Sequence, residues 1–350
     1  MFSITLEDVA SILHDYDIAV GISNISELQR YHYERNDPNS KEVRLIVKVD
    51  LEDASSLVIR FKNEENVTLE LIESQSQFAA VLKKNNIITP TQYQANGKYA
   101  NWYSIGGYDV IVTLEEFVEN EVKVVDEAIA KKTGVLLAKT HTIAEQYNLH
   151  VENDVLFNPF AHNDLFAFDA FMSIESTLEG DDKVLFNKIV DAYNSYMEVL
   201  APLRNHPQYA VQGDISDCNL YLTKWGEVGI FDFNRSGDNI LFCDAVMQAI
   251  FEARLMDYPE NKEDGFETKI LESFWKGYCS VRSFTAEEQK LYPYLCAIID
   301  AFWSSDIRWN EDSLMNAQEA GDVESVRRWL STIYERLALP RSTDSNLSNR

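Results

Sequence analysis

Residues 211–246 read VQGDISDCNLYLTKWGEVGIFDFNRSGDNILFCDAV. Two short apolar runs, residues 220–222 and 228–231, flank the turn Lys224–Trp225–Gly226, and this pattern predicts a β-hairpin. Because a hairpin folds its ends together, we expect Asn219 and Asp232 to lie side by side at its open end. Asp214 precedes the hairpin in a loop.

These three side chains suit a magnesium–phosphate site. Mg²⁺ prefers oxygen donors and takes one or two protein carboxylates beside nucleotide phosphates. In phosphoryl transfer, one carboxylate accepts the hydroxyl proton while an asparagine and a second aspartate hold the metal. The spacing of Asp214, Asn219 and Asp232 is compatible with that division of roles.

The first 120 residues are rich in predicted strands, and we expect a small mixed β-sheet lobe there. One helix is expected at residues 68–85, where apolar residues recur at helical spacing. The predicted strands are Glu27–Tyr33, Val43–Leu51, Leu57–Lys62, Tyr99–Ser104 and Asp109–Phe117. Alternation in the third strand places Leu57, Ile59 and Phe61 on one face and Arg60 with Lys62 on the other.

Beyond an acidic connection at residues 119–125, the pattern becomes helical. Amphipathic helices are predicted at residues 125–147, 181–203, 243–256, 269–280, 287–303 and 323–337. The expected organisation is an N-lobe at 1–118, a helical C-lobe at 119–340 and a disordered tail at 341–350. The fold class is therefore α+β, with two lobes.

Composition narrows the classes of partner. The formal net charge of −26 makes nucleic acid and anionic lipid poor partners and favours a cationic small molecule. Four scattered cysteines without a CxxC pair argue against disulfides and zinc. No secretory signal or apolar run of transmembrane length is present, so we expect a cytoplasmic protein.

G-D-x-x-x-x-N followed by I-x-D-F resembles the catalytic and metal segments of the aminoglycoside phosphotransferase and choline kinase-like family. That family has the two-lobed protein-kinase-like fold. The resemblance extends in outline over residues 15–335 and is specific at 212–244. It implies an ATP-dependent kinase that uses Mg²⁺ to phosphorylate a hydroxyl of a small molecule, such as an aminoglycoside, an amino alcohol, a sugar or a homoserine-like compound.

The resemblance also implies roles for individual residues. Asp214 is the expected catalytic carboxylate, and Asn219 and Asp232 are the expected metal ligands. The nucleotide-binding residues it implies are Arg60 on the phosphates, Glu73 orienting Arg60, and Glu115, Glu116 and Phe117 holding adenine through their backbone. Glu70 and Gln75 are alternatives to Glu73, and Lys62 is an alternative to Arg60. The polar loop Arg35–Lys41 is the expected phosphate cover.

The chain departs from the family pattern at two positions. Gln212 replaces a histidine that supports the loop, a role that the glutamine amide can take over. Asn234 stands where glycine or aspartate is common. These departures motivate the alternative of a nucleotide-binding regulatory or binding protein without turnover. A protein kinase is disfavoured, because only about a dozen residues separate Asp232 from Asp244 where an activation loop is needed.

Other candidate residues have structural interpretations. His141 on an apolar helix face is expected to be a hydrogen-bonded core histidine, and His162 is expected to pack among aromatic side chains. Asp244 is expected to bind backbone or the catalytic loop. Residues 301–312 carry Trp303, Asp306, Trp309 and Glu311, which could line a pocket for a cationic acceptor, although aromatic residues at helical spacing more often form core.

Overall fold

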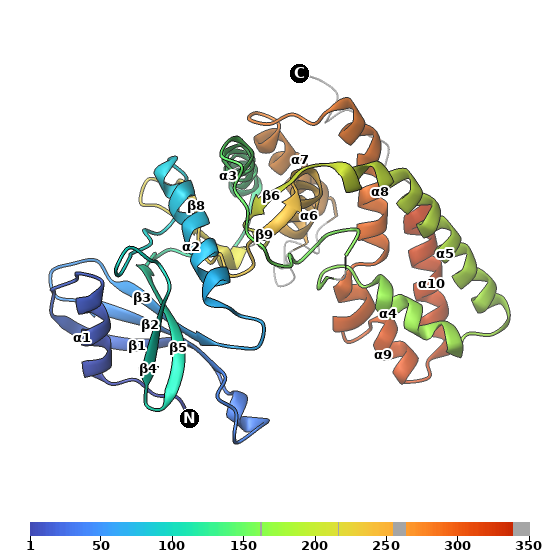
Figure 1. Ribbon diagram of the computed structural model, residues 1–350. Coiled ribbons are helices and arrows are strands. Elements are labelled where there is room, and N and C mark those ends of the chain that lie inside the picture. The colour runs from blue at the N-terminus through green and yellow to red at the C-terminus, as the bar shows by residue number, and fades with distance from the viewer. Residues whose placement is uncertain (162, 216, 255–263, 339–350) are drawn as a thin grey trace. The chain divides into compact units, whose positions relative to one another are not determined.

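The computed structural model describes residues 1–161, 163–215, 217–254 and 264–338 (Figure 1). The chain divides into two compact units. The first consists of Met1–Lys123, Leu149–Asn153 and Cys218–Asn234. The predicted hairpin thus groups with the N-terminal unit, although the sequence placed it in the C-lobe. The predicted tail at 341–350 and His162 lie outside the described residues.

A five-stranded sheet forms the centre of the first unit. Its order is β1-β2-β3-β5-β4, and every pairing is antiparallel, so the sheet is not mixed. The strands are β1 (Ile22–Tyr31), β2 (Val43–Leu51), β3 (Leu57–Asn63), β4 (Asn101–Ile105) and β5 (Tyr108–Glu116). Four of the five predicted strands agree within two residues at each end, and β1 begins five residues earlier than predicted.

The two faces of the sheet carry different helices (Figure 1). Leu57, Ile59 and Phe61 point into a buried core that also contains Val9 and Leu13 of helix α1 (Leu6–Asp15). The opposite face packs on helix α2 (Leu69–Lys84), which the sequence predicted. Arg60 and Lys62 belong to this second face, as strand alternation required.

Helix α1 was not predicted. Thr5 accepts a hydrogen bond from the backbone N–H of Asp8, whose side chain accepts one from the N–H of Thr5. This reciprocal capping box satisfies two N–H groups that a helix start otherwise leaves without partners. Thr5 and Asp8, three residues apart ahead of an apolar run, are the sequence signal for this helix start.

Helices dominate the second unit (Figure 1). They are α3 (Glu127–Gln146), α4 (Phe168–Ser173), α5 (Gly180–Leu200), α6 (Leu241–Ala253), α7 (Phe266–Tyr278), α8 (Ala286–Ala301), α9 (Leu314–Glu319) and α10 (Val323–Ala338). Six of them correspond to the six predicted helices. A short antiparallel pair, β6 (Gln208–Val211) with β9 (Gly237–Ile240), was not predicted. No helix among the described residues has the length and apolar character that a bilayer crossing requires.

Together, the two units have the α+β organisation that the sequence predicted: one unit built on a small sheet and one unit that is mainly helical. The sheet unit carries the hairpin with Asn219 and Asp232. The helical unit carries the Asp214 loop between β6 and the hairpin.

Candidate functional site

The hairpin of the first unit consists of β7 (Leu220–Leu222) and β8 (Val228–Ile230). At its open end, the backbone N–H of Phe231 donates to the carbonyl of Asn219 at 3.0 Å. Asp232 is the next residue, so the hairpin brings the asparagine and the aspartate to one end, as its spacing indicated. The N–H of Ile230 also donates to the carbonyl of Ile88 at 2.9 Å, which ties the hairpin to the first unit.

Asp232 has a left-handed backbone conformation with φ of 56°. Aspartate and asparagine adopt such φ values more readily than other non-glycine residues, and seven further Asn or Asp residues of the described chain do so. Its Oδ1 accepts from the N–H of Asn234 at 3.2 Å, and its Oδ2 lies 3.4 Å from Nη1 of Arg60. Burial raises the pKa of Asp232, but the charges of Arg60 and Lys62 outweigh it and leave that pKa below its usual value.

The carboxylate that holds Arg60 comes from β5. Nε and Nη2 of Arg60 donate to Oε1 of Glu115 at 2.9 and 2.8 Å. The other oxygen of Glu115 accepts from Nε2 of Gln92 at 2.8 Å. Burial lowers the pKa of Arg60, but Asp232 and Glu115 outweigh that effect and raise it. Arg60 is therefore a fixed, charged guanidinium between two carboxylates.

The prediction that Glu73 orients Arg60 is wrong. Oε2 of Glu73 accepts from the backbone N–H groups of Tyr99 and Ala100, both at 2.8 Å. Of the two alternatives on α2, Gln75 binds the backbone carbonyl of Asn234 instead, and Glu70 is exposed. Glu73 of helix α2 thus binds the backbone just before β4. The acid partner of Arg60 is Glu115 of β5, the strand that pairs with β3.

We expect the substitution Glu115→Gln to weaken nucleotide binding about 10- to 100-fold, because a charged hydrogen-bond pair contributes about 1.5–3 kcal/mol. Of its two carboxylate partners, Arg60 would keep Asp232, the expected metal ligand, and its charge would compete there with a metal ion. Equilibrium binding of AMP-PNP with Mg²⁺ measures the effect. A larger loss in Glu73→Gln than in Glu115→Gln would instead support the acid on α2.

The connection after β5 uses part of its backbone within the unit. The N–H of Glu116 donates to the carbonyl of Thr91, and that of Phe117 donates to the carbonyl of Ser56, both at 2.9 Å. The carboxylate of Glu116 accepts from the hydroxyl of Thr91 at 2.9 Å. Any hold of this connection on adenine therefore has to use its carbonyl groups or N–H groups further along the chain.

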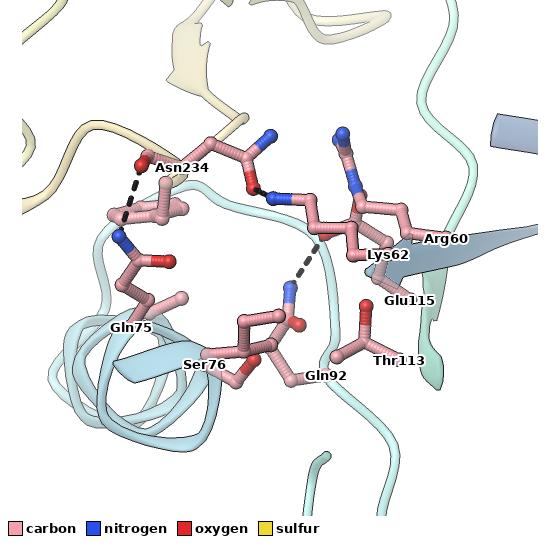
Figure 2. Close-up of a pocket in the computed structure, with 11 residues that line it drawn as sticks. Arg60, Lys62, Gln75, Ser76, Gln92, Thr113, Glu115 and Asn234 are labelled. Carbon is pink, nitrogen blue, oxygen red and sulfur yellow. Dashed lines mark hydrogen bonds and ion pairs between the residues drawn. The ribbon is translucent and has the colours of Figure 1, made fainter. Parts of the chain in front are cut away.

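A second polar contact of the first unit joins Asn234 to Lys62, which lies on the same face of β3 as Arg60. The ammonium of Lys62 donates to the side-chain oxygen of Asn234, and Nε2 of Gln75 donates to the backbone carbonyl of Asn234 at 2.9 Å (Figure 2). Burial, together with the charge of Arg60, lowers the pKa of Lys62 to about 8. These side chains line a pocket with about 30 Å³ of space, enough for one or two water molecules.

In the second unit, Gln212 supports the loop that carries Asp214. Its buried side-chain oxygen accepts from the backbone N–H of Asp214 at 2.7 Å. Gly213 has a φ of +79°, and a Cβ there would lie 2.8 Å from the carbonyl oxygen of Arg235. The loop therefore requires glycine at this position. The glutamine amide thus supports the loop, as expected of the residue that stands in place of the family histidine.

A buried chain of hydrogen bonds continues from this loop. The N–H of Ile215 donates to Gln248 at 2.9 Å, and Gln248 donates to Asp244 at 3.3 Å. His141 links the other oxygen of Asp244, at 2.9 Å, to the hydroxyl of Tyr278, at 3.0 Å. His141 is thus a hydrogen-bonded core histidine as predicted, and Asp244 acts on the loop through Gln248.

The segment considered for a cationic acceptor is largely engaged in internal contacts. Trp303 is buried beside the ring of Phe251, with ring centroids 6.1 Å apart. Asp306 pairs with Arg336 at 2.7 Å. Trp309 is exposed. Trp303 is therefore a core residue, in agreement with the structural interpretation of this aromatic tract. The carboxylate of Asp306 is already paired with the guanidinium of Arg336.

The donors at the end of the hairpin fit a magnesium–nucleotide site. Asn219 and Asp232 offer a carboxamide and a carboxylate oxygen, the hard donors that Mg²⁺ prefers, and a two-residue set leaves room for phosphates and water. Among the described residues, no group of three or more histidine, cysteine, aspartate or glutamate side chains could hold a metal.

Comparison with solved structures identifies the architecture. An aminopropanol kinase associated with a microcompartment is 15% identical, covers 96% of both chains and has a TM-score of 0.58. An amicoumacin kinase in complex with AMP-PNP, Ca²⁺ and Ami is 12% identical over 97% of both chains, with a TM-score of 0.59. The fold is that of the small-molecule phosphotransferases.

A spectinomycin phosphotransferase solved with ADP and spectinomycin shares the same fold, at 14% identity and a TM-score of 0.51 over 97% of this chain and 99% of that one. No family model matches the chain, and the comparison with curated proteins gave no match. The protein-kinase-like fold inferred from residues 212–244 is thereby confirmed, since the similarity extends over nearly the full length.

Proposed function

We propose that this protein is an ATP-dependent kinase that transfers the γ-phosphoryl group to a hydroxyl of a small molecule. The observation that carries the proposal is the hairpin end, where Asn219 and Asp232 meet through the Phe231–Asn219 hydrogen bond and Asp232 is paired with Arg60. Phosphoryl transfer needs an oxygen-ligated metal and a fixed cation at the phosphates, and these residues can supply both.

In the proposed reaction, the acceptor hydroxyl oxygen forms a bond to the γ-phosphorus while the bond from that phosphorus to the ADP oxygen breaks. The carboxylate of Asp214 orients the hydroxyl and takes its proton. Arg60 offsets the charge of the phosphates. Mg²⁺, when bound by Asn219 and Asp232, would neutralise charge on the phosphate oxygens. The backbone carbonyls of residues 115–117 are the proposed hold on adenine.

The structural relatives support the acceptor class. They comprise kinases of aminopropanol, amicoumacin and spectinomycin, and two of them were solved with adenine nucleotides. The net charge of −26 favours a cationic hydroxyl compound among the candidates, because the field of an acidic protein attracts cations. We therefore propose that the acceptor is an amino alcohol or an aminoglycoside before a neutral sugar. We also propose a cytoplasmic location.

The non-catalytic alternative rested on Gln212 and Asn234. Both residues have structural partners: Gln212 holds the Asp214 loop, and Asn234 binds Lys62 and Gln75. The two departures thus preserve support for Asp214 and Asp232, the residues on which turnover would depend. This favours an active kinase over a binding protein derived from one.

A screen for ADP release that depends on both Mg²⁺ and an added acceptor tests the proposal. We expect release with at least one hydroxylated amine and the appearance of a phosphorylated acceptor by mass spectrometry. The same acceptor with its hydroxyl methylated should give no product. Tight AMP-PNP binding without turnover for any amino alcohol, aminoglycoside, sugar or homoserine-like compound would favour the regulatory alternative.

A further inference from the structure

Asn234 is held from two elements that are distant in the sequence (Figure 2). Lys62 of β3 donates to its side-chain oxygen, and Gln75 of α2 donates to its backbone carbonyl at 2.9 Å. The N–H of Asn234 in turn donates to Oδ1 of Asp232 at 3.2 Å. We call Lys62, Gln75 and Asn234 the Asn234 clamp, because these three residues join a strand, a helix and the candidate metal ligand.

Burial makes these hydrogen bonds strong. Lys62 is 7% exposed and Gln75 is 5% exposed. A buried ammonium has lost its water shell, so a well-placed oxygen partner is needed to offset that loss. Hydrogen bonds with a charged donor are about twice as strong as neutral ones, and the low dielectric of the interior strengthens them further. Asn234 therefore has little freedom to move away from β3 and α2.

The Asp232 carboxylate is what the clamp holds. Its backbone lies in the left-handed region, with φ of 56°, which aspartate adopts more readily than most non-glycine residues. Arg60 holds one carboxylate oxygen at 3.4 Å, a long distance for an ion pair. Asn234 holds the other oxygen at 3.2 Å. The clamp fixes the residue that provides this second contact.

We propose that Lys62, Gln75 and Asn234 are positioning residues that hold Asp232 in its metal-binding conformation. The proposal rests on the proposed function, since it assigns Asp232 to the metal. It also gives Asn234 a defined chemistry. An aspartate at this position would still accept the bond from Lys62, whereas a glycine would leave the ammonium without that acceptor.

The test measures Mg²⁺ affinity with the full chain at saturating AMP-PNP. Residues that orient metal ligands typically change metal affinity 10- to 100-fold when replaced. We expect a loss of that size in Lys62→Met and in Asn234→Gly, and an affinity within threefold of wild type in Asn234→Asp. The double variant Lys62→Met/Asn234→Gly should lose no more than either single variant, because both remove the same bond.

A matched pair of variants on α2 separates the clamp from general damage to the helix. Gln75→Ala removes the bond to Asn234 and should weaken Mg²⁺ binding. Gln77→Ala removes an exposed side chain two residues away, bonded to Glu73 at 3.0 Å, and should not. In the clamp variants, AMP-PNP affinity without metal should stay within twofold of wild type.

The outcomes separate the two proposals. Wild-type protein that fails to bind AMP-PNP with Mg²⁺ would overturn the proposed function together with the clamp. Wild-type binding with unchanged Mg²⁺ affinity in Lys62→Met and Asn234→Gly would overturn the clamp alone. A loss of metal-free AMP-PNP affinity in Lys62→Met, not reproduced in Asn234→Gly, would also overturn it and place Lys62 directly on the phosphates.

Discussion

The substitution Asp214→Asn should lower kcat for acceptor phosphorylation about 10²- to 10⁴-fold, which is the usual contribution of a positioned general base. An asparagine amide can still contact the hydroxyl, but it cannot take its proton. The loop should keep its shape, because the bonds from the backbone N–H groups of Asp214 and Ile215 to Gln212 and Gln248 do not use the replaced carboxylate.

Steady-state kinetics with the best acceptor from the screen measure this effect. AMP-PNP affinity with Mg²⁺ should be unchanged, which distinguishes a chemical defect from a binding defect. Asp191→Asn, at an exposed position on α5 of the same unit, is the matched control and should keep wild-type kcat. An Asp214→Asn enzyme that retains more than a tenth of wild-type kcat would remove Asp214 from the proposed mechanism.

The substitution Gly134→Ala should destabilise the helical unit strongly. A Cβ on Gly134 of α3 would lie 2.1 Å from the carbonyl oxygen of Phe274, and one on Gly277 of α7 would lie 2.0 Å from that of Lys131. The obstacles are backbone atoms, so a change of rotamer does not relieve the clash. The alanine gains about 1 kcal/mol in helix propensity, whereas overpacking costs about 1–3 kcal/mol, and more where backbone atoms have to move.

Thermal and denaturant unfolding followed by circular dichroism measure the loss. Because the chain has two units, the comparison uses transition midpoints and does not assume a single two-state transition. Gly277→Ala should behave like Gly134→Ala. Lys139→Val, which places a β-branched residue at an exposed position of α3, is the control and should change the midpoint little. A wild-type midpoint in Gly134→Ala would contradict the close crossing.

The glycine crossing also bears on the catalytic loop. Nδ1 of His141 on α3 lies 3.0 Å from the hydroxyl of Tyr278 on α7. His141 also binds Asp244, which accepts a hydrogen bond from Gln248. Gln248 in turn accepts from the N–H of Ile215. Moving α3 from α7 would stretch the first link of that chain. Any Gly134 variant that still folds should therefore lose kcat more than it raises KM for nucleotide.

Local patterns determined much of what the sequence could predict. The hairpin spans residues 220–230, so the meeting of Asn219 and Asp232 depends on one turn and two short strands. Alternation along β3 separated Leu57, Ile59 and Phe61 from Arg60 and Lys62, because successive strand residues point to opposite faces. The helix at 68–85 was likewise recognisable from its apolar spacing and its polar ends.

Contacts between distant residues were decided only by the tertiary structure. The pairing of Arg60 with Glu115 follows from the β3–β5 register, in which Val58 lies opposite Glu115 and Arg60 opposite Thr113. The resemblance implied Glu73 instead, because the family usually supplies this acid from the helix, whereas the spacing to Leu82 and Pro90 pointed to Gln75. The bond from Lys62 to Asn234 joins residues 172 positions apart, and no periodic pattern marks such a pair.

The sequence by itself thus determined the local helices and strands, the faces of the strands, and the spacing of Asp214, Asn219 and Asp232 along the chain. The tertiary structure decided which acid holds Arg60, which residues secure Asp232 and where two helices touch at Gly134 and Gly277. The physical reason is range. Turns, alternation and helical periodicity arise between neighbours in the chain, whereas ion pairs and backbone contacts depend on how separate elements pack in space.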